Sequence, residues 1–235
     1  MTDIKKDSTV SNPVKMSKSL GNVISPHYLI EKYGMNAVRF YFNYAGPAQN
    51  DVIFSEENLC ELYNSMLANE YGNLVQRVMG LVYKNFQKTN NFSGQEIICS
   101  YIPFYEELNN QTLFSSLNKQ TFENLDRYVD EFSFKKYIDL IWQSIKKSNQ
   151  YIQEEKPWTL KNTDSKRMGT VLYVLLETIK RITIALQPII PDGCSAILKR
   201  LHLENEMKFN KIEEMLIPGT IIIQDLNPVF PRIEK

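Results

Sequence analysis

Cysteine and histidine are scarce in this sequence of 235 residues, which has three cysteines and two histidines. The cysteines are widely separated and form no Cys-x-x-Cys pair, so the sequence predicts neither a zinc site nor a disulfide framework. This cysteine usage is typical of a reducing, intracellular compartment. His27 and His202 lie far from any cluster of potential partners, and we expect helix-end or surface positions for both, with no metal site and no catalytic triad.

Long apolar runs and an excess of charge of one sign are absent as well. The apolar run at 171–176, "VLYVLL", is too short to cross a membrane, and the N-terminal "MTDIKKDSTVSN" lacks the apolar centre of a secretory signal. Lys plus Arg and Asp plus Glu number 27 each, which argues against a nucleic-acid binder that depends on bulk positive charge. The sequence therefore predicts an intracellular protein without a membrane partner, and it still allows RNA recognition through a few local residues.

Hydrophobic residues make up 43% of the chain, and most of them recur at helical spacing, which predicts a mainly α-helical fold. Two short helices hinged near Gly34 are expected first, the earlier one with Ser25 as N-cap and Pro26 at its first position. A longer helix should begin at Ser55, with a buried stripe at Leu67, Leu74 and Leu81. Further amphipathic helices are expected at about 110–131, 133–154, 164–187 and 192–203. The polar stretch 85–96 is expected to break the helical pattern, and the proline-rich tail is expected to be extended.

The segment "PVKMSKSLGNVISP", residues 13–26, is the strongest local signal for chemistry. Lys15 and Lys18 lie three positions apart, Ser17 lies between them, and Gly21 lets the backbone turn. Two flexible ammonium groups suit the neutralisation of a polyphosphate, and lysines that reach a departing pyrophosphate in the transition state lower the barrier to nucleotidyl transfer. For an arbitrary Lys-x-x-Lys pair, a solvated basic loop would be the better interpretation.

The full string "KMSKSLGN", from Lys15 to Asn22, resembles the signature loop of class I aminoacyl-tRNA synthetases. The resemblance implies that Lys15, Ser17 and Lys18 bind ATP, which the full enzyme uses with Mg²⁺. It also implies that Lys18 is the chief catalytic lysine of amino-acid activation and that Lys15 assists it. Several amino-acid specificities share this loop, so the loop alone does not identify the amino acid.

Three later segments resemble the methionyl-tRNA synthetase family, namely 55–77, "EEKPWTL" at 154–160 and "PVFPRIE" at 228–234. The resemblance implies a tRNA-recognising half that binds the CAU anticodon of tRNA-Met, while the full enzyme activates methionine with ATP and esterifies it to tRNA; it implies no DNA partner. Two alternatives stay open. The chain could be a free-standing tRNA-binding module without catalysis, or the equivalent region of a leucyl, isoleucyl or valyl enzyme.

The resemblance also implies a domain order. We expect a lead-in at 1–10 that is disordered or foreign to the natural protein, followed at 11–54 by a stem-contact module carrying the loop. An anticodon-binding helix bundle is expected at 55–205, and a C-terminal segment at 206–235 should fold back along the bundle toward that module.

Asn73 and Arg77 are four residues apart and therefore neighbours on one helix face, at the edge of the leucine stripe. An amide and a guanidinium at such a place can read the edge of an unstacked base. From the residues alone, an N-cap-like amide and a surface salt bridge of Arg77 to Glu70 or to a neighbouring helix would be the preferred interpretation.

Trp158 follows a rigid proline, so its indole could be a stacking platform, and stacking on a base contributes about 1–3 kcal/mol. The alternative is a core tryptophan that covers the end of the bundle, a role we expect for Trp142. By resemblance, Asn73, Arg77 and Trp158 bind the anticodon, and Trp158 stacks on its first base. This requires the helices at 55–82 and 133–155 to pack side by side.

The second class I signature, a His-x-Gly-His type sequence, is absent. The nucleotide-binding halves of such a synthetase would need well over a hundred residues ahead of Lys15, whereas fourteen are present. We therefore expect a C-terminal piece of a synthetase, produced by truncation, proteolysis or an incomplete gene model, with mobile loop lysines and no ability to form methionyl-adenylate by itself. Cytoplasm and the mitochondrial or plastid matrix are equally compatible with the sequence, and it does not define the oligomeric state.

Overall fold

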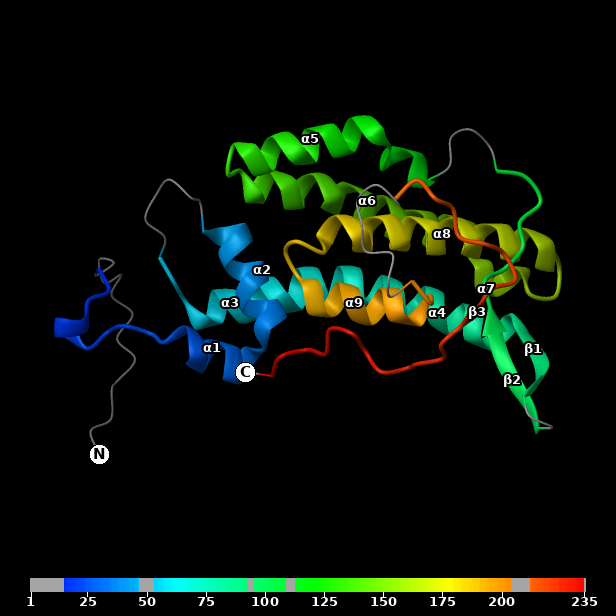
Figure 1. Cartoon of the computed structure of the whole chain (residues 1–235), viewed down its shortest axis with the longest axis horizontal. Helices are drawn as coiled ribbons and strands as arrows, with labels where there is room; N and C mark the ends of the chain where they lie inside the picture. Colours follow the sequence, from blue (N-terminus) through cyan, green and yellow to red (C-terminus); the bar gives the residue numbers. More distant parts are fainter. Residues whose placement is uncertain (1–14, 47–52, 93–94, 109–112, 204–211, 235) are drawn as a thin grey trace.

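The structure of the protein, a computed structural model, describes residues 15–46, 53–92, 95–108, 113–203 and 212–234. It is mainly helical, as predicted, with one small sheet. The longer helices run roughly along the length of the molecule (Figure 1). In that view α5 and α6 lie above α8, while α9 and α4 lie below it.

The described elements follow one another in a simple order along the chain. The helices are α1 Pro26–Tyr33, α2 Met35–Ala45, α3 Glu56–Leu62, α4 Asn73–Asn85, α5 Lys119–Asp130, α6 Phe134–Glu155, α7 Pro157–Leu160, α8 Ser165–Leu186 and α9 Pro191–Arg200. A π-helical segment, Tyr63–Gly72, joins α3 to α4, and 3₁₀ turns occur at Lys18–Leu20 and Leu113–Ser116. The strands are β1 Gln87–Phe92, β2 Gln95–Tyr101 and β3 Ile221–Ile222.

The first helix pair follows the sequence prediction. Gly34 separates α1 from α2 and has a φ of 82°, a backbone conformation that glycine adopts without strain. Pro26 is at the start of α1 as expected, but the side chain of Ser25 makes no capping hydrogen bond. Ser25 therefore occupies the predicted N-cap position in an extended conformation without capping through its hydroxyl, and Pro26 favours the helix start.

Residues 56–85 form one continuous helical path made of α3, the π-helical segment and α4. Ser55 caps it, because its hydroxyl oxygen accepts a hydrogen bond from the backbone N–H of Asn58 at 3.3 Å. Leu67 and Leu74 are buried as predicted, whereas Leu81 is half-buried. Beyond Leu74 the buried stripe continues through Val78 and Val82, which are spaced at one turn of an α-helix.

The helical pattern breaks at 85–96 as predicted, since α4 ends at Asn85, but a β-hairpin that the sequence did not predict begins there. β1 and β2 pair in antiparallel fashion from Gln87↔Ser100 to Phe92↔Gln95, and β3 adds to β2 through Ser100↔Ile222 and Tyr101↔Ile221. In Figure 1 the hairpin projects from the lower right of the molecule. Most of β1 therefore has no apolar core to face, so its polar sequence shows no strand periodicity.

The boundaries expected for the four remaining predicted helices differ in their outcome. The helix expected at 110–131 begins only at Lys119, where the Asn118 side chain accepts a hydrogen bond from the Thr121 N–H at 3.1 Å. The helices expected at 133–154, 164–187 and 192–203 are confirmed as α6, α8 and α9, to within about three residues at each end.

The core is built around α8, in which every residue from Met168 to Leu186 is buried. It packs against α4, α6, α7 and α9. Trp142 on α6 is a core residue as predicted, being 3% exposed. Its indole N–H donates to Oε2 of Glu70 at 2.8 Å.

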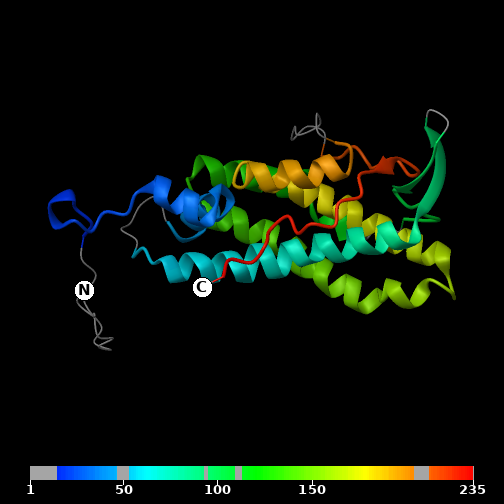
Figure 2. The same ribbon diagram turned by 90° about the horizontal axis from the view of Figure 1, so that it is seen from below.

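The C-terminal segment, residues 223–234, runs beside the 56–85 helical path back toward α1 (Figure 2). The Asn64 side chain binds the backbone of Ile233 twice, with its Nδ2 donating to the carbonyl and its Oδ1 accepting from the N–H, both at 2.9 Å. Phe230 packs against Tyr71 with ring centroids 5.8 Å apart. The predicted lead-in at 1–10 and the predicted boundary at 205–206 lie outside the described residues.

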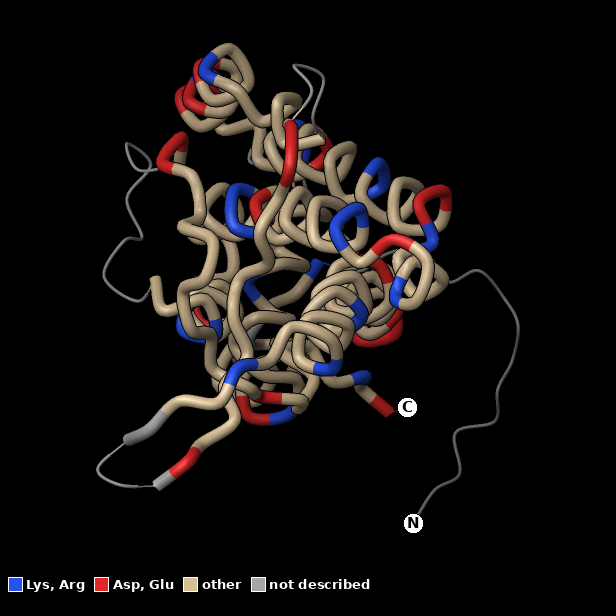
Figure 3. The backbone as a smooth tube through the Cα atoms, turned by 90° about the vertical axis from the view of Figure 1, so that its right-hand side faces the viewer, with Lys and Arg blue, Asp and Glu red and all other residues tan. Residues whose placement is uncertain are grey.

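Charged residues of both signs are interspersed over the end of the molecule that carries the hairpin (Figure 3). None of the helices in the described ranges combines the length and the apolar character that a bilayer span needs.

Candidate functional site

The lysine–serine loop closes on itself through Asn22. The backbone N–H of Ser17 donates to Oδ1 of Asn22 at 2.8 Å, and Nδ2 of Asn22 donates to the carbonyl of Lys15 at 3.2 Å. Gly21 permits this closure with a φ of 66°. Sequence reasoning missed this role of Asn22, whose side chain closes the loop.

This loop lies at one end of the molecule, beyond α1 (Figures 1 and 2). Lys15 is exposed, and the hydroxyl oxygens of Ser17 and Ser19 lie 3.2 Å apart. The backbone of Lys18 begins the 3₁₀ turn Lys18–Leu20, while its side chain lies outside the described part of the chain. Ammonium and hydroxyl donors gathered on one exposed loop can bind phosphate oxygens.

A second group of candidate residues lies on α4 and α7. The guanidinium carbon of Arg77 is 5.7 Å from the centre of the Trp158 ring, a cation–π arrangement. Trp158 is 43% exposed, so it is not a core residue. The structure thus brings Arg77 and Trp158 together on the surface, although 81 positions separate them in the sequence.

Gln153 on α6 is a partner of Arg77 that sequence reasoning missed. A guanidinium only donates hydrogen bonds, so the Gln153 amide lies with its oxygen toward Arg77 and accepts from Nη1 and Nη2, each at 3.2 Å. No ion pair joins Arg77 to any residue in the described ranges. The alternative salt bridge, to Glu70 or to a neighbouring helix, is therefore wrong for the described residues: Glu70 accepts from Trp142, and the neighbouring helix α6 contacts Arg77 through a neutral amide.

A tight reversal between α6 and α7 determines where Trp158 lies. Lys156 adopts a left-handed conformation with φ 43° and ψ 55°, and its N–H donates to the Ile152 carbonyl at 3.2 Å. Pro157 then starts α7, and both the N–H and the hydroxyl of Thr159 donate to the Lys156 carbonyl, at 2.9 and 2.8 Å. The reversal places the four-residue helix α7 against the bundle. The indole of Trp158, on α7, therefore lies next to α4.

Asn73 is exposed at the first position of α4, one turn before Arg77. It lines a groove of about 470 Å³ beside the C-terminal segment. The helices expected at 55–82 and 133–155 do pack side by side, because α4 and the π-helical segment both contact α6. Arg77 and Trp158 are in direct contact, and Asn73 lies next to that pair along the helix.

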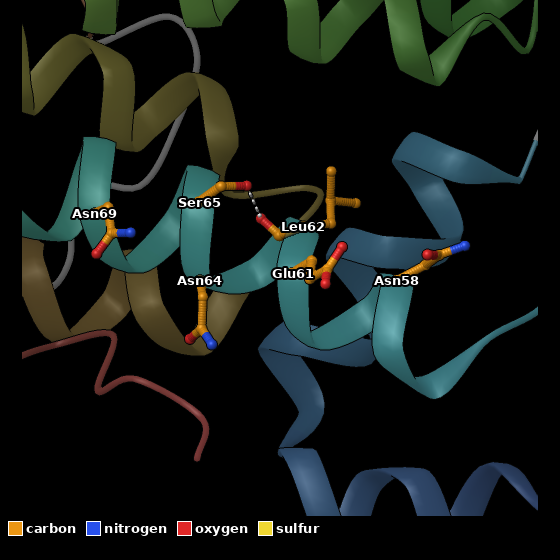
Figure 4. A pocket seen from close by; sticks show the side chains of 6 residues that line it. All are labelled: Asn58, Glu61, Leu62, Asn64, Ser65 and Asn69. Carbon is orange, nitrogen blue, oxygen red and sulfur yellow. Dashed lines mark hydrogen bonds between the residues drawn. The ribbon is translucent and has the colours of Figure 1, made fainter. Parts of the chain in front are cut away.

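A wider, shallow hollow of about 620 Å³ lies on the first part of the same helical path (Figure 4). Three asparagines line it, together with Glu61, Leu62 and Ser65, and the Ser65 hydroxyl donates to the Leu62 carbonyl at 3.2 Å. The carboxylate of Glu61 makes this hollow a poor place for a phosphate group.

Metal chemistry has no support among the described side chains. They contain no group of three or more His, Cys, Asp or Glu side chains placed to hold an ion. His27 and His202 are exposed at helix ends, as the sequence predicted.

Comparison with known families gives two matches that together span most of the chain. Residues 106–223 match the family described as the anticodon binding domain of methionyl tRNA ligase. Residues 7–79 match the family described as tRNA synthetases class I (M).

Curated relatives agree with these matches. The chain is 33% identical over 221 residues to a methionine–tRNA ligase of Ureaplasma parvum, covering 93% of this chain and 40% of the relative. It is also 33% identical over 230 residues to the Thermotoga maritima methionine–tRNA ligase, covering 95% of this chain and 34% of the relative. The chain thus spans about a third to two fifths of the length of these curated relatives.

Solved structures of methionyl-tRNA synthetases also align with most of this chain. The methionyl-tRNA synthetase of Mycobacterium tuberculosis in complex with methionyl-adenylate aligns with a TM-score of 0.81 at 29% identity, covering 92% of this chain and 41% of that one. Its apo form aligns with a TM-score of 0.79 at 26% identity, covering 91% and 42%.

Proposed function

Because this chain belongs to the methionyl-tRNA ligase family, we propose that it is the tRNA-recognising part of a methionine–tRNA ligase and binds the CAU anticodon of tRNA-Met. The apposition of Arg77 and Trp158 on the surface carries the proposal. The methionyl matches favour this function over the leucyl, isoleucyl and valyl alternatives.

The Trp158 indole is the stacking platform of the proposed site. Arg77 and Gln153 lie on neighbouring helices, and their contact holds the guanidinium beside the ring. A base stacked on the exposed part of the indole would present its edge to the guanidinium and to the amide of Asn73. Stacking on an aromatic ring tolerates every base, so the amide and guanidinium would supply the preference for cytosine.

The lysine–serine loop, residues 15–22, would take part in the activation of methionine in the complete ligase. Lys15, Ser17 and Lys18 would bind the phosphates of ATP and stabilise the charge that builds on pyrophosphate as methionine is activated. The segment 15–22 has no carboxylate, so Mg²⁺ would arrive as the ATP complex, held by phosphate oxygens. We propose that the complete ligase then esterifies methionine to tRNA-Met.

The decisive experiment titrates the chain with a CAU anticodon stem-loop and follows tryptophan fluorescence. Trp142 is buried and hydrogen-bonded, so a Trp142→Phe variant retains the signal of Trp158 alone. We expect binding to quench that signal, and we expect Trp158→Ala to weaken binding by about 5- to 150-fold, the equivalent of 1–3 kcal/mol. Equal affinity for a stem-loop with a scrambled anticodon would remove the methionine assignment.

A second measurement separates recognition from catalysis. We expect no methionine-dependent exchange between ATP and pyrophosphate from the 235-residue chain by itself, even when it binds the stem-loop. Exchange by the purified chain would contradict this expectation. Anticodon binding without any catalytic partner in the cell would favour the free-standing binding module.

A further inference from the structure

The π-helical segment, Tyr63–Gly72, interrupts the 56–85 helical path over ten residues. At its end the Asn73 N–H is shared between the carbonyls of Ala68 and Glu70, five and three positions back, whereas an α-helix uses the carbonyl four positions back. π-helical geometry is rare, occurs mostly as single turns and is frequent at functional sites. A stretch of this length therefore depends on contacts from outside the helix.

The C-terminal segment supplies such contacts on one side of the π-helical segment. The Asn64 amide bonds both backbone groups of Ile233, each at 2.9 Å. Oδ1 of Asn69 accepts from Nε and Nη2 of Arg232 at 3.0 and 2.7 Å. Both asparagines belong to the π-helical segment (Figure 4). The end of the C-terminal segment is thus bonded to the part of the helical path whose winding is unusual.

Gly72 joins the unusual winding to the docking of the C-terminal segment. A Cβ at this position would lie 2.9 Å from the carbonyl oxygen of Leu67, five positions back, and 3.4 Å from the Phe230 side chain. Because each turn of a π-helix takes up more residues than a turn of an α-helix, a residue lies over the one five positions back only in the π form. A side chain at position 72 would therefore oppose the π-helical winding and the docked C-terminal segment at the same time.

On its other side the π-helical segment is anchored to the bundle near its end. Oε2 of Glu70 accepts from the Trp142 indole at 2.8 Å, and the Glu70 carbonyl accepts from Nδ2 of Asn149 at 3.1 Å. The hydroxyl oxygens of Tyr71 and Thr183, both buried, are 2.7 Å apart. A change in winding would therefore leave α4 in place and move α3, at the opposite end of the segment.

α3 connects the π-helical segment to the helices that follow the lysine–serine loop. Oε2 of Glu56, the first residue of α3, accepts from Nζ of Lys32 at 2.8 Å and from the hydroxyl of Tyr33. Both partners are on α1, the first helix after the loop. A displacement of α3 would therefore be passed to α1 and to the base of the loop.

We propose that residues 63–72 form a two-state joint, which is π-helical while the C-terminal segment is docked and α-helical when that segment is released. The α form has fewer residues per turn, so α3 would point in another direction relative to α4. Packed elements of this kind change between discrete arrangements and do not deform continuously. The C-terminal segment is the strap that holds the joint in its π form, and its docking sets the position of α1.

The test compares amide hydrogen exchange in Gly72→Ala and Gly80→Ala variants of the complete 235-residue chain. Gly72→Ala should speed exchange about ten-fold in residues 228–234 and should slow it in residues 63–73, as the α form replaces the π form. Gly80→Ala is the matched control, because a Cβ on Gly80 would meet no described atom within 4 Å. It should raise the melting temperature through helix propensity and leave exchange in both ranges unchanged.

Phe230→Ala releases the C-terminal segment from the opposite side of the contact, since it removes the ring that packs on Tyr71. It should also slow exchange in residues 63–73, whereas a simple loss of packing would speed exchange there. Faster or unchanged exchange in residues 63–73 of either folded variant would overturn the proposal, and so would a C-terminal segment that stays protected in Gly72→Ala. Phe230→Ala keeps the test decisive if Gly72→Ala does not fold, because it leaves the joint itself unaltered.

A crystal structure of Gly72→Ala gives the direct view of the joint. We expect the Asn73 N–H to donate to the carbonyl of Asn69, four positions back, and we expect α3 and α1 to be displaced together relative to α4. A π-helical segment that persists without a docked C-terminal segment would overturn the proposal. An α-helical segment with α1 unmoved would overturn it as well.

Discussion

Replacing Glu177 with glutamine should lower the free energy of unfolding by about 3–5 kcal/mol, the usual cost of removing one partner from a buried ion pair. Glu177 on α8 is fully buried, and its Oε1 lies 2.8 Å from both Nζ of Lys180 and Nε of Arg181. Its Oε2 accepts from the backbone N–H of Leu216 at 2.9 Å. The side chains of the two cations are only 3% and 8% exposed.

The magnitude follows from what glutamine leaves behind. The amide keeps the size of the carboxylate and one acceptor oxygen, but two buried cations lose the negative charge of Glu177. Water cannot reach them to compensate, and the Leu216 N–H also faces a possible donor. The loss should therefore be several times that of an ordinary neutral hydrogen bond.

Asp139→Asn is the matched control, because it makes the same chemical change on the surface. Asp139 pairs with Lys135 at 2.7 Å on α6, with side chains that are 44% and 59% exposed. Such an i,i+4 pair contributes about 0.3–0.5 kcal/mol. The two carboxylate-to-amide changes should thus differ by roughly a factor of ten in free energy.

Urea unfolding followed by circular dichroism measures both variants. With a slope of about 3 kcal/mol/M, the Glu177→Gln midpoint should fall by roughly 1–1.7 M at an unchanged slope. The Asp139→Asn midpoint should move by less than about 0.2 M. A Glu177→Gln loss below about 1 kcal/mol would refute the reasoning, since it would mean that the cations do not depend on the carboxylate.

Three further predictions test other parts of the fold. Lys156→Gly should raise stability by about 1 kcal/mol in thermal melting, because glycine adopts the left-handed conformation without strain; a lower melting temperature would contradict this. Lys32 hydrogen-bonds Glu56 and lowers the pKa of that carboxyl below its usual 4.5, so its stabilisation is present above pH 4.5 and is lost as pH falls through the lower folded-state pKa. Glu56→Gln should flatten the melting temperature between about pH 5 and pH 3, and an unchanged acid profile would count against the pairing. Asn64→Leu removes both hydrogen bonds to Ile233 and should cost about 1–2 kcal/mol, seen as faster amide exchange in the C-terminal segment but not in α8.

Much of the helical architecture could be predicted from the sequence. Apolar spacing defined α6, α8 and α9, and Gly34 marked the boundary between α1 and α2, because backbone preference and periodicity are local properties. The loop from Lys15 to Asn22 was equally visible, since its lysines, serine and glycine are neighbours in the chain.

Other features had no local signal. The polar strand β1 is stabilised by pairing with β2 and not by a buried face, so its sequence resembles a loop. The burial of Glu177 could not be predicted either, because α8 is covered on every side by other helices and by the 212–217 segment. Charged residues signal a surface unless partners from elsewhere in the chain surround them.

The sequence by itself determined most of the helical segments and which residues could bind a phosphate or a base. Only the tertiary structure decided that Arg77 lies over Trp158, that Gln153 holds it there, and that Arg232 closes a groove beside Asn73. The physical reason is that periodicity records which face of a helix is buried but not which partner covers it. Contacts between residues far apart in sequence depend on how all the faces pack together.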